Sequence, residues 1–251
     1  MTSATFRLYR FTPQTAGLLI VAATAWLVTV RLSQEMESMG SMGLALPPFV
    51  GVWTLMMAGM MLPSIAPLAS MYSRSVRSSR LTRLALFGAG YLVVWAAAGI
   101  PAFGLTSLAS NIAANSITST VAAAAIFAWC GLYQLTPLKR RCLEHCRSPL
   151  ALLLHYGSYR GALRDMRAGL HHGAYCLGCC WSLFILLIAF GIMNVLAMVV
   201  LAAVVLIEKL WTRGEMFSRA VAGAAFGLAI AVWFFPGVAP GLLGGEMRGG
   251  M

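Results

Sequence analysis

Acidic residues are scarce in this sequence. It has seven Asp and Glu against eighteen Lys and Arg, and charged residues make up 10% of the chain, whereas a soluble domain carries roughly 25%. The sequence contains no paired-carboxylate motif, no Ser/His/Asp pattern and no glycine-rich Walker loop for a nucleotide phosphate. These absences argue against an ATP-driven pump and against the hydrolytic enzymes that such motifs mark.

Apolar residues dominate instead. They make up 60% of the 251 residues, and the mean hydropathy is +0.81. An apolar run of about 20 residues is long enough to span a bilayer as a helix. The sequence therefore predicts an all-α, polytopic membrane helix bundle that forms a single integral membrane domain over residues 1–251. About six transmembrane helices are expected, at Thr15–Val30, Pro48–Met71, Leu84–Leu105, Ile117–Leu135, Ser182–Ile207 and Phe217–Phe235.

The basic residues lie mostly on one side of this predicted bundle. Fourteen Lys and Arg fall in the N-terminal segment, in residues 74–83 and 139–167, and in the C-terminal tail. Four fall on the other side: Arg31, Lys209, Arg213 and Arg219. Because Lys and Arg accumulate in cytoplasmic loops, we expect both termini in the cytoplasm of a multi-pass protein of the bacterial inner membrane. The net charge of +11 then reflects topology, with the lipid bilayer rather than nucleic acid as the partner.

Cysteine and histidine are concentrated in one segment, residues 137–181. On this topology the segment is cytoplasmic, where thiols stay reduced. The stretch CLEHC and the stretch CLGCC each place three ligands at i, i+3 and i+4, which share one face of a helix. We expect these two faces, each at the cytoplasmic end of a transmembrane helix, to close on one metal ion. The candidate ligands are Cys142, His145, Cys146, Cys176, Cys179 and Cys180, with His171 and His172 as outer ligands.

The sequence does not decide whether two other residues in or near this segment take part in metal binding. Cys130 is either a packing residue or a further ligand below the main cluster, and His155 is expected at the surface. Between the fourth and fifth transmembrane helices, leucines alternate with arginines over residues 149–170. This pattern indicates short amphipathic helices that lie on the membrane surface.

Methionine forms a second constellation. The loop after the first predicted helix reads MESMGSM, and the second predicted helix contains MMAGMM. A thioether binds Cu(I) without losing a proton and has little affinity for Zn(II) or Mg(II). These methionines therefore favour copper and are candidate ligands along a metal path, although methionine also fills gaps in apolar cores. They are Met36, Met39, Met42, Met56, Met57, Met60 and Met61.

Two polar positions in the fifth predicted helix receive structural interpretations. Asn194 is expected inside that helix, where it would hydrogen-bond to a neighbouring helix. Glu208 and Lys209, adjacent at the outer end of the same helix, are expected to pair with each other.

Three stretches together resemble a bacterial family of predicted metal-binding integral membrane proteins of unknown function. They are MMAGMMLPSIAP (56–67), YQLTPLKRRCLEHCRSP (133–149) and GAYCLGCCWSLFILLIAFGIMNVLAM (173–198), the last followed by IEK (207–209). The resemblance covers roughly residues 50–210. It implies metal binding by the cysteines and the histidine of CLEHC and CLGCC, and it says nothing about the methionine loop.

These observations predict a membrane protein that binds a soft metal, most consistently Cu(I), with zinc as the alternative. It would transport the ion or deliver it to a metal-receiving protein by ligand exchange, without enzymatic catalysis. Two alternatives are a membrane metal chaperone or sensor that does not translocate the ion, and a membrane thiol–disulfide enzyme that uses Cys176, Cys179 and Cys180. The direction of transport is not predicted.

Overall fold

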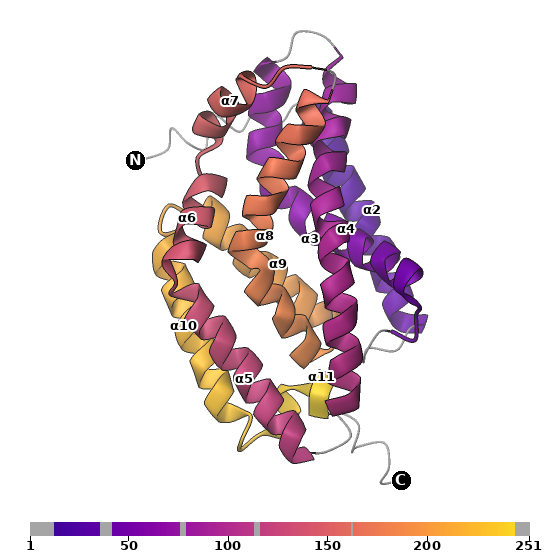
Figure 1. Cartoon of the computed structure of the whole chain (residues 1–251), viewed down its shortest axis with the longest axis vertical. Helices are drawn as coiled ribbons and strands as arrows, with labels where there is room; N and C mark the ends of the chain where they lie inside the picture. The colour runs from indigo at the N-terminus through magenta and orange to yellow at the C-terminus, as the bar shows by residue number, and fades with distance from the viewer. Residues whose placement is uncertain (1–12, 36–41, 76–78, 113–115, 162, 244–251) are drawn as a thin grey trace.

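The computed structural model describes residues 13–35, 42–75, 79–112, 116–161 and 163–243, and helices are the only regular structure in these ranges. The all-α prediction is therefore confirmed. The elements, in the labels of Figure 1, are α2 (Pro13–Glu35), α3 (Leu46–Ser75), α4 (Arg80–Ile112), α5 (Ser116–Gln134), α6 (Pro137–Cys146), α7 (Pro149–Gly157), α8 (Arg164–Phe190), α9 (Val195–Leu210), α10 (Gly214–Ala231), η1 (Pro236–Val238) and α11 (Pro240–Leu243).

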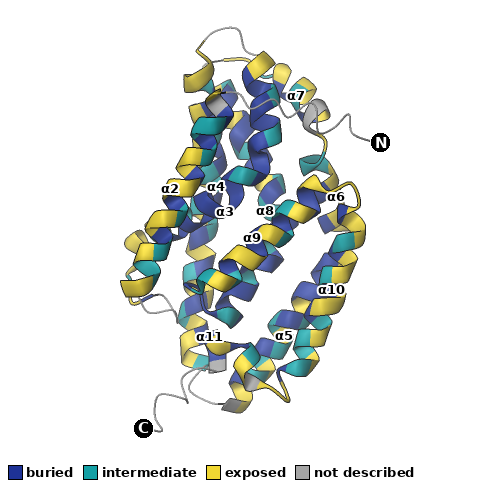
Figure 2. Ribbon diagram, turned by 180° about the vertical axis from the view of Figure 1, so that it is seen from behind, coloured by how far each residue is buried: buried dark blue, intermediate teal, exposed yellow. Residues whose placement is uncertain are grey.

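The long helices run along the long axis of an elongated bundle (Figure 1). Within the described residues, five helices, α2, α3, α4, α5 and α8, are long and apolar enough to cross a membrane. Their outward faces carry large apolar side chains, such as Leu27 at 69% exposed and Ile100 at 58%. Figure 2 shows exposed positions along the outer sides of these helices. An exposed apolar surface of this extent is typical of a protein that meets lipid or another protein.

The fifth predicted span does not form one helix, which corrects the prediction for Ser182–Ile207. Helix α8 ends at Phe190, and the next residue, Gly191, has a φ of 93°, which is readily adopted only by a residue without a side chain. Asn194 then caps α9, because its Oδ1 atom accepts a hydrogen bond of 3.1 Å from the Ala197 backbone N–H. Asn194 is thus the cap of α9 and not a residue inside a helix, and its Nδ2 atom donates a hydrogen bond of 3.1 Å to the carbonyl oxygen of Phe190, the last residue of α8. The apolar run folds back on itself, and α9 returns along the bundle.

Because of this reversal, the described chain ends at the opposite end of the bundle from where it begins. Helices α4 and α8 run in the same direction, since Phe87 faces Gly169 and Trp95 faces Phe184 further along. Helix α2 is an antiparallel neighbour of α3 and begins at the same end of the bundle as α4 and α8. Helix α11 lies at the opposite end, where Gly241 contacts Gly191. The expectation that both termini share one side is therefore wrong for the ends of the described chain.

The turn between α9 and α10 lies against α6, on the side that carries the cysteine and histidine segment. The Lys139 ammonium is 2.7 Å from the Glu208 carboxylate, and Arg147 donates hydrogen bonds to the backbone carbonyls of Trp211 and Thr212. The placement of Lys209, Arg213 and Arg219 on the opposite side is therefore wrong. Glu208 also pairs with Lys139 and not with Lys209.

Helices α4 and α8 approach each other more closely than side chains would allow. A Cβ atom built on Gly169 would lie 2.0 Å from the carbonyl oxygen of Phe87, and one built on Gly90 would lie 2.3 Å from that of Met166. Both glycines are therefore required by the backbone contact. Further along both helices, the close approach brings the Tyr91 hydroxyl of α4 to 2.9 Å from the Cys176 sulfur of α8.

Of the surface-helix pattern predicted over residues 149–170, only α7 is a separate short helix, whereas residues 164–170 form the start of the long helix α8. Helix α6 precedes this stretch and carries CLEHC. Helix α6 begins at Thr136, whose hydroxyl accepts a hydrogen bond from the Lys139 N–H, followed by Pro137 in the first turn. It packs against α8. This contact brings the CLEHC and CLGCC stretches together.

Candidate metal centre

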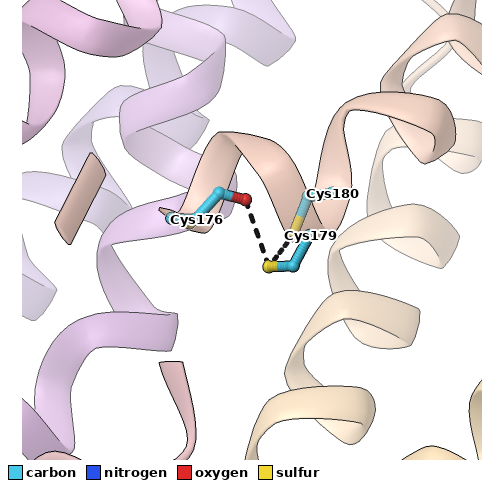
Figure 3. A group of neighbouring side chains, drawn as sticks. All are labelled: Cys176, Cys179 and Cys180. Carbon is cyan, nitrogen blue, oxygen red and sulfur yellow. Dashed lines mark hydrogen bonds between the residues drawn. The ribbon is translucent and has the colours of Figure 1, made fainter. Parts of the chain in front are cut away.

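Both ligand stretches are helical, as their spacing predicts, and their sulfur atoms converge. The Cys146 Sγ atom of α6 lies 4.0 Å from the Cys179 Sγ atom of α8. Within α8, the Sγ atoms of Cys179 and Cys180 are 3.2 Å apart, and all three α8 sulfurs lie within 4.8 Å of one another. Figure 3 shows the Cys179 sulfur directed between the Cys176 carbonyl oxygen, which accepts its hydrogen bond, and the Cys180 sulfur. Four thiols from two helices therefore form one group.

This four-sulfur group, Cys146 with Cys176, Cys179 and Cys180, is shielded from water. The three α8 thiols are at most 1% exposed, and Cys146 is half-buried. The α8 cysteines lie in the middle of a 27-residue helix and not at its end, which corrects the expected position. None of the six cysteines forms a disulfide. Thiols that are reduced and enclosed in this way are available to a soft metal ion.

A lysine completes the surroundings of Cys176. The Lys209 Nζ atom is 2.8 Å from the Cys176 sulfur and 3.1 Å from the Ser64 hydroxyl of α3. The Tyr91 hydroxyl lies 2.9 Å from the same sulfur. An ammonium group only donates hydrogen bonds, so the Cys176 sulfur accepts this one. Lys209 was not among the site residues predicted from the sequence. The sequence does show a charged residue at the end of an apolar run, and such a residue requires a partner when it is buried.

Cys142 lies beside the group but contacts α8 differently. Its sulfur is 2.9 Å from the position that a Cβ atom of Gly178 would occupy, so glycine at 178 leaves room for it. Burial raises the pKa of the Cys142 thiol. For Cys146, a hydrogen bond with Cys176, together with burial, raises the pKa of the thiol. Without a metal, both α6 thiols therefore keep their protons at neutral pH.

Cys130 is fully buried in α5. It does not belong to the sulfur group found among the described residues. Cys130 is therefore a suitable control position, because it is a buried cysteine outside the candidate centre.

The histidines separate into two places. His145 stacks on Tyr175, with ring centroids 3.8 Å apart, and faces His171 at 5.5 Å. His172 is buried between Phe87 and Tyr91 on the other side of α8. Burial lowers the pKa of His145, so its imidazole is neutral at pH 7.

Two of these imidazoles have an unsatisfied nitrogen. The His145 Nε2 atom and the His172 Nδ1 atom are buried without a hydrogen-bond partner in the described structure. A buried polar atom without a partner is unusual in a folded protein. Imidazole nitrogens together with thiols are a donor set that soft metals prefer.

The methionines of α3, Met56, Met57, Met60 and Met61, are at most 1% exposed. Met42 is also buried, at 3%, so it does not lie on an open surface. Met36 and Met39 lie outside the described residues. A metal role for these thioethers, like that for the cysteines and histidines, stays a prediction.

Comparison with known proteins extends this description. No curated protein and no solved structure matches the chain. A family model described as "PpoB2: Copper chaperone" matches residues 50–233, which include both cysteine stretches and Lys209. The sequence-based expectation of a metal-related family is thereby confirmed, and copper is the metal that the family description gives. Since the match covers more than half of the chain, this protein belongs to the PpoB2 family of copper chaperones.

Proposed function

We propose that this protein is a membrane-embedded chaperone that holds Cu(I) on the four-sulfur group and delivers it to a partner protein. The observation that carries the proposal is the convergence of Cys146 from α6 with Cys176, Cys179 and Cys180 from α8. Thiolates are soft ligands that select Cu(I), and the carboxylates that hard cations prefer are absent from the sulfur group.

The length and composition of the helices support the location in a membrane. Five helices have the length and composition of transmembrane segments, and the outer faces of the bundle are apolar. We place the bundle in a bacterial inner membrane, with α6, α7 and the α9–α10 turn on the cytoplasmic side. With Arg213 and Arg219 reassigned to this side, the basic residues outside the bundle favour that orientation more strongly than the sequence alone suggested.

Copper would enter and leave the sulfur group by ligand exchange. A Cu–S bond forms as the thiol releases its proton to solvent and the bond between copper and its previous ligand breaks, and the ion keeps its oxidation state throughout. Lys209 stabilises the negative charge that accumulates when several thiolates bind one monovalent ion, because an ammonium at 2.8 Å interacts strongly in a buried site. Holding and passing on an ion requires no catalysed reaction, so we propose no enzymatic activity.

The experiment is the copper content of the purified protein in detergent. The parent loaded with Cu(I) under anaerobic conditions should retain copper after desalting. The Cys176→Ser/Cys179→Ser variant should lose it, while Cys130→Ser should behave as the parent. Equal copper in all three proteins would contradict the proposal, as would a parent that retains none.

Transport across the membrane is a second candidate, favoured by the buried methionines of α3. Ser64, which Lys209 contacts, follows Met60 and Met61 by about one helical turn, so α3 leads from the methionines to the thiol site. Replacing Met57 and Met61 by leucine keeps the apolar bulk. If the protein transports copper, this variant should take up less copper in cells although the purified protein loads normally. Unchanged uptake would favour delivery without translocation.

A further inference from the structure

Cys146 of α6 is half-buried, but the three α8 sulfurs of the four-sulfur group have no direct access to solvent, because they are almost completely buried. A large partner protein cannot reach these atoms. Copper held by the α8 sulfurs must therefore leave by way of Cys146, which is 4.0 Å from Cys179, and of the side chains that lead from α6 to the surface. Ligand exchange requires that each such side chain offers an electron pair to a soft metal.

A row of imidazoles provides this link. His145 shares with Cys142 and Cys146 the face of α6 defined by their i, i+3 and i+4 spacing, His171 is on α8, and His155 is on α7. Ring centroids are 5.5 Å apart between His145 and His171, and 5.2 Å apart between His171 and His155. The side chains become more accessible along the row, since His145 and His171 are half-buried and His155 is exposed. Figure 1 shows α7 beyond α6, toward the start of α8.

The surrounding tyrosines hold the rings in this row. The Tyr156 hydroxyl lies 3.3 Å from the His171 Nδ1 atom, and the Tyr159 hydroxyl lies 3.2 Å from the His155 Nε2 atom. Each contact occupies one ring nitrogen and leaves the other for a metal, which is the usual arrangement of a metal-binding histidine. The buried His145 Nε2 atom is unpartnered.

We infer that His145, His171 and His155 form the route by which Cu(I) leaves the four-sulfur group for a partner that docks at α7. This inference rests on the proposed function. In each step a Cu–N bond forms as a Cu–S or Cu–N bond breaks, a thiolate that is released takes up a proton from solvent, and no electron is transferred. The nitrogens of the three rings do not meet at one point, so the row serves for passage and not for storage.

The test separates the rate of transfer from the affinity. His155→Phe/His171→Phe keeps both rings and removes both ligands beyond His145. The full-length variant, loaded with Cu(I) in detergent, should retain the copper content and affinity of the parent. It should release copper several-fold more slowly to an excess of a bulky, water-soluble Cu(I) chelator, followed by the colour of the copper–chelator complex. The control, Leu154→Phe, adds a ring at a neighbouring exposed position of α7 and should release copper at the parental rate.

A second variant retains soft ligands of a different shape. His155→Met/His171→Met places a thioether at each position, and its release rate should recover toward that of the parent. Parental release from the phenylalanine variant would overturn the route. A matching loss of affinity would also overturn it, because the histidines would then be storage ligands. A parent that binds no copper would instead contradict the proposed function itself.

Discussion

The Lys209 ammonium nitrogen lies 2.8 Å from the Cys176 sulfur, in a part of the bundle where neither side chain has appreciable access to water. The two residues come from α9 and α8, which fold back on each other at Gly191. A buried cation is costly unless a negative group compensates it. In this protein the compensating group is a candidate copper ligand, so the charge of the site and the binding of the ion are linked.

Lys209→Met should therefore weaken Cu(I) binding. Methionine keeps most of the apolar length and removes the charge that stabilises a negatively charged copper–thiolate group. By analogy with residues that support metal ligands, the loss should be about 10–100-fold in affinity. Competition with a Cu(I) chelator of known affinity measures it. Arg213→Met removes an exposed positive charge from the neighbouring turn and should change little; an equal loss in both variants would indicate a general charge effect.

Copper affinity should rise with pH. The pKa of the Cys146 thiol is raised above its ordinary value of 9.0, so the metal-free protein holds this proton at neutral pH and the ion must displace it. The dissociation constant should fall continuously between about pH 6 and pH 9. His145, whose pKa lies below 6.5, adds no dependence above that pH. Cys146→Ser should flatten the slope and Cys130→Ser should not. A parental slope in Cys146→Ser would exclude Cys146 as one of the thiols that release protons on binding.

Gly169→Ala should destabilise the bundle. The added methyl group would meet the Phe87 carbonyl oxygen at 2.0 Å, so α4 and α8 would have to separate. Overpacking of this kind costs about 1–3 kcal/mol of unfolding free energy. Thermal unfolding in detergent should show a lower Tm. Gly88→Ala in α4 has open space around its Cβ position and should leave the Tm unchanged or slightly higher, so a similar decrease in both variants would refute the close-contact argument.

Accessibility labelling tests the orientation. Cysteines introduced at Thr212 and Ser158 should react with an impermeant thiol reagent from the same side of the membrane. One introduced at Ser110, an exposed position near the far end of α4, should react from the other side. The expected cytoplasmic side for Thr212 follows from its contact with Arg147. Labelling of Thr212→Cys together with Ser110→Cys would show that the α9–α10 turn lies on the opposite face.

The convergence of α6 and α8 could be anticipated because three ligands at i, i+3 and i+4 share one face of any helix. The break at Gly191 could not be anticipated. Residues 182–207 are apolar on both sides of it, and their hydropathy is the same for one long helix as for two helices that fold back on each other. The Asn194 cap is visible in the sequence only as a single polar residue, which equally suits an interhelical hydrogen bond.

The role of Lys209 was hidden for a related reason. Adjacent residues on a helix point about 100° apart, so Glu208 and Lys209 face different neighbours. Glu208 reaches Lys139 of α6, and Lys209 reaches Cys176 of α8. In a straight helix without the reversal at Gly191, neither Lys139 nor Cys176 would lie near this position. The sequence alone therefore suggests only that Glu208 and Lys209 pair with each other.

The distance in sequence between Ser64, Cys176 and Lys209 has a consequence for biosynthesis. A ribosome completes α3 and α8 before it completes α9, so a nascent chain exposes its cysteines while the ammonium that will face them has not yet been made. The site is finished only when α9 folds back beside α8. Copper bound before that moment would meet thiols without the positive charge of Lys209. We therefore expect the full copper affinity only after α9 has been inserted.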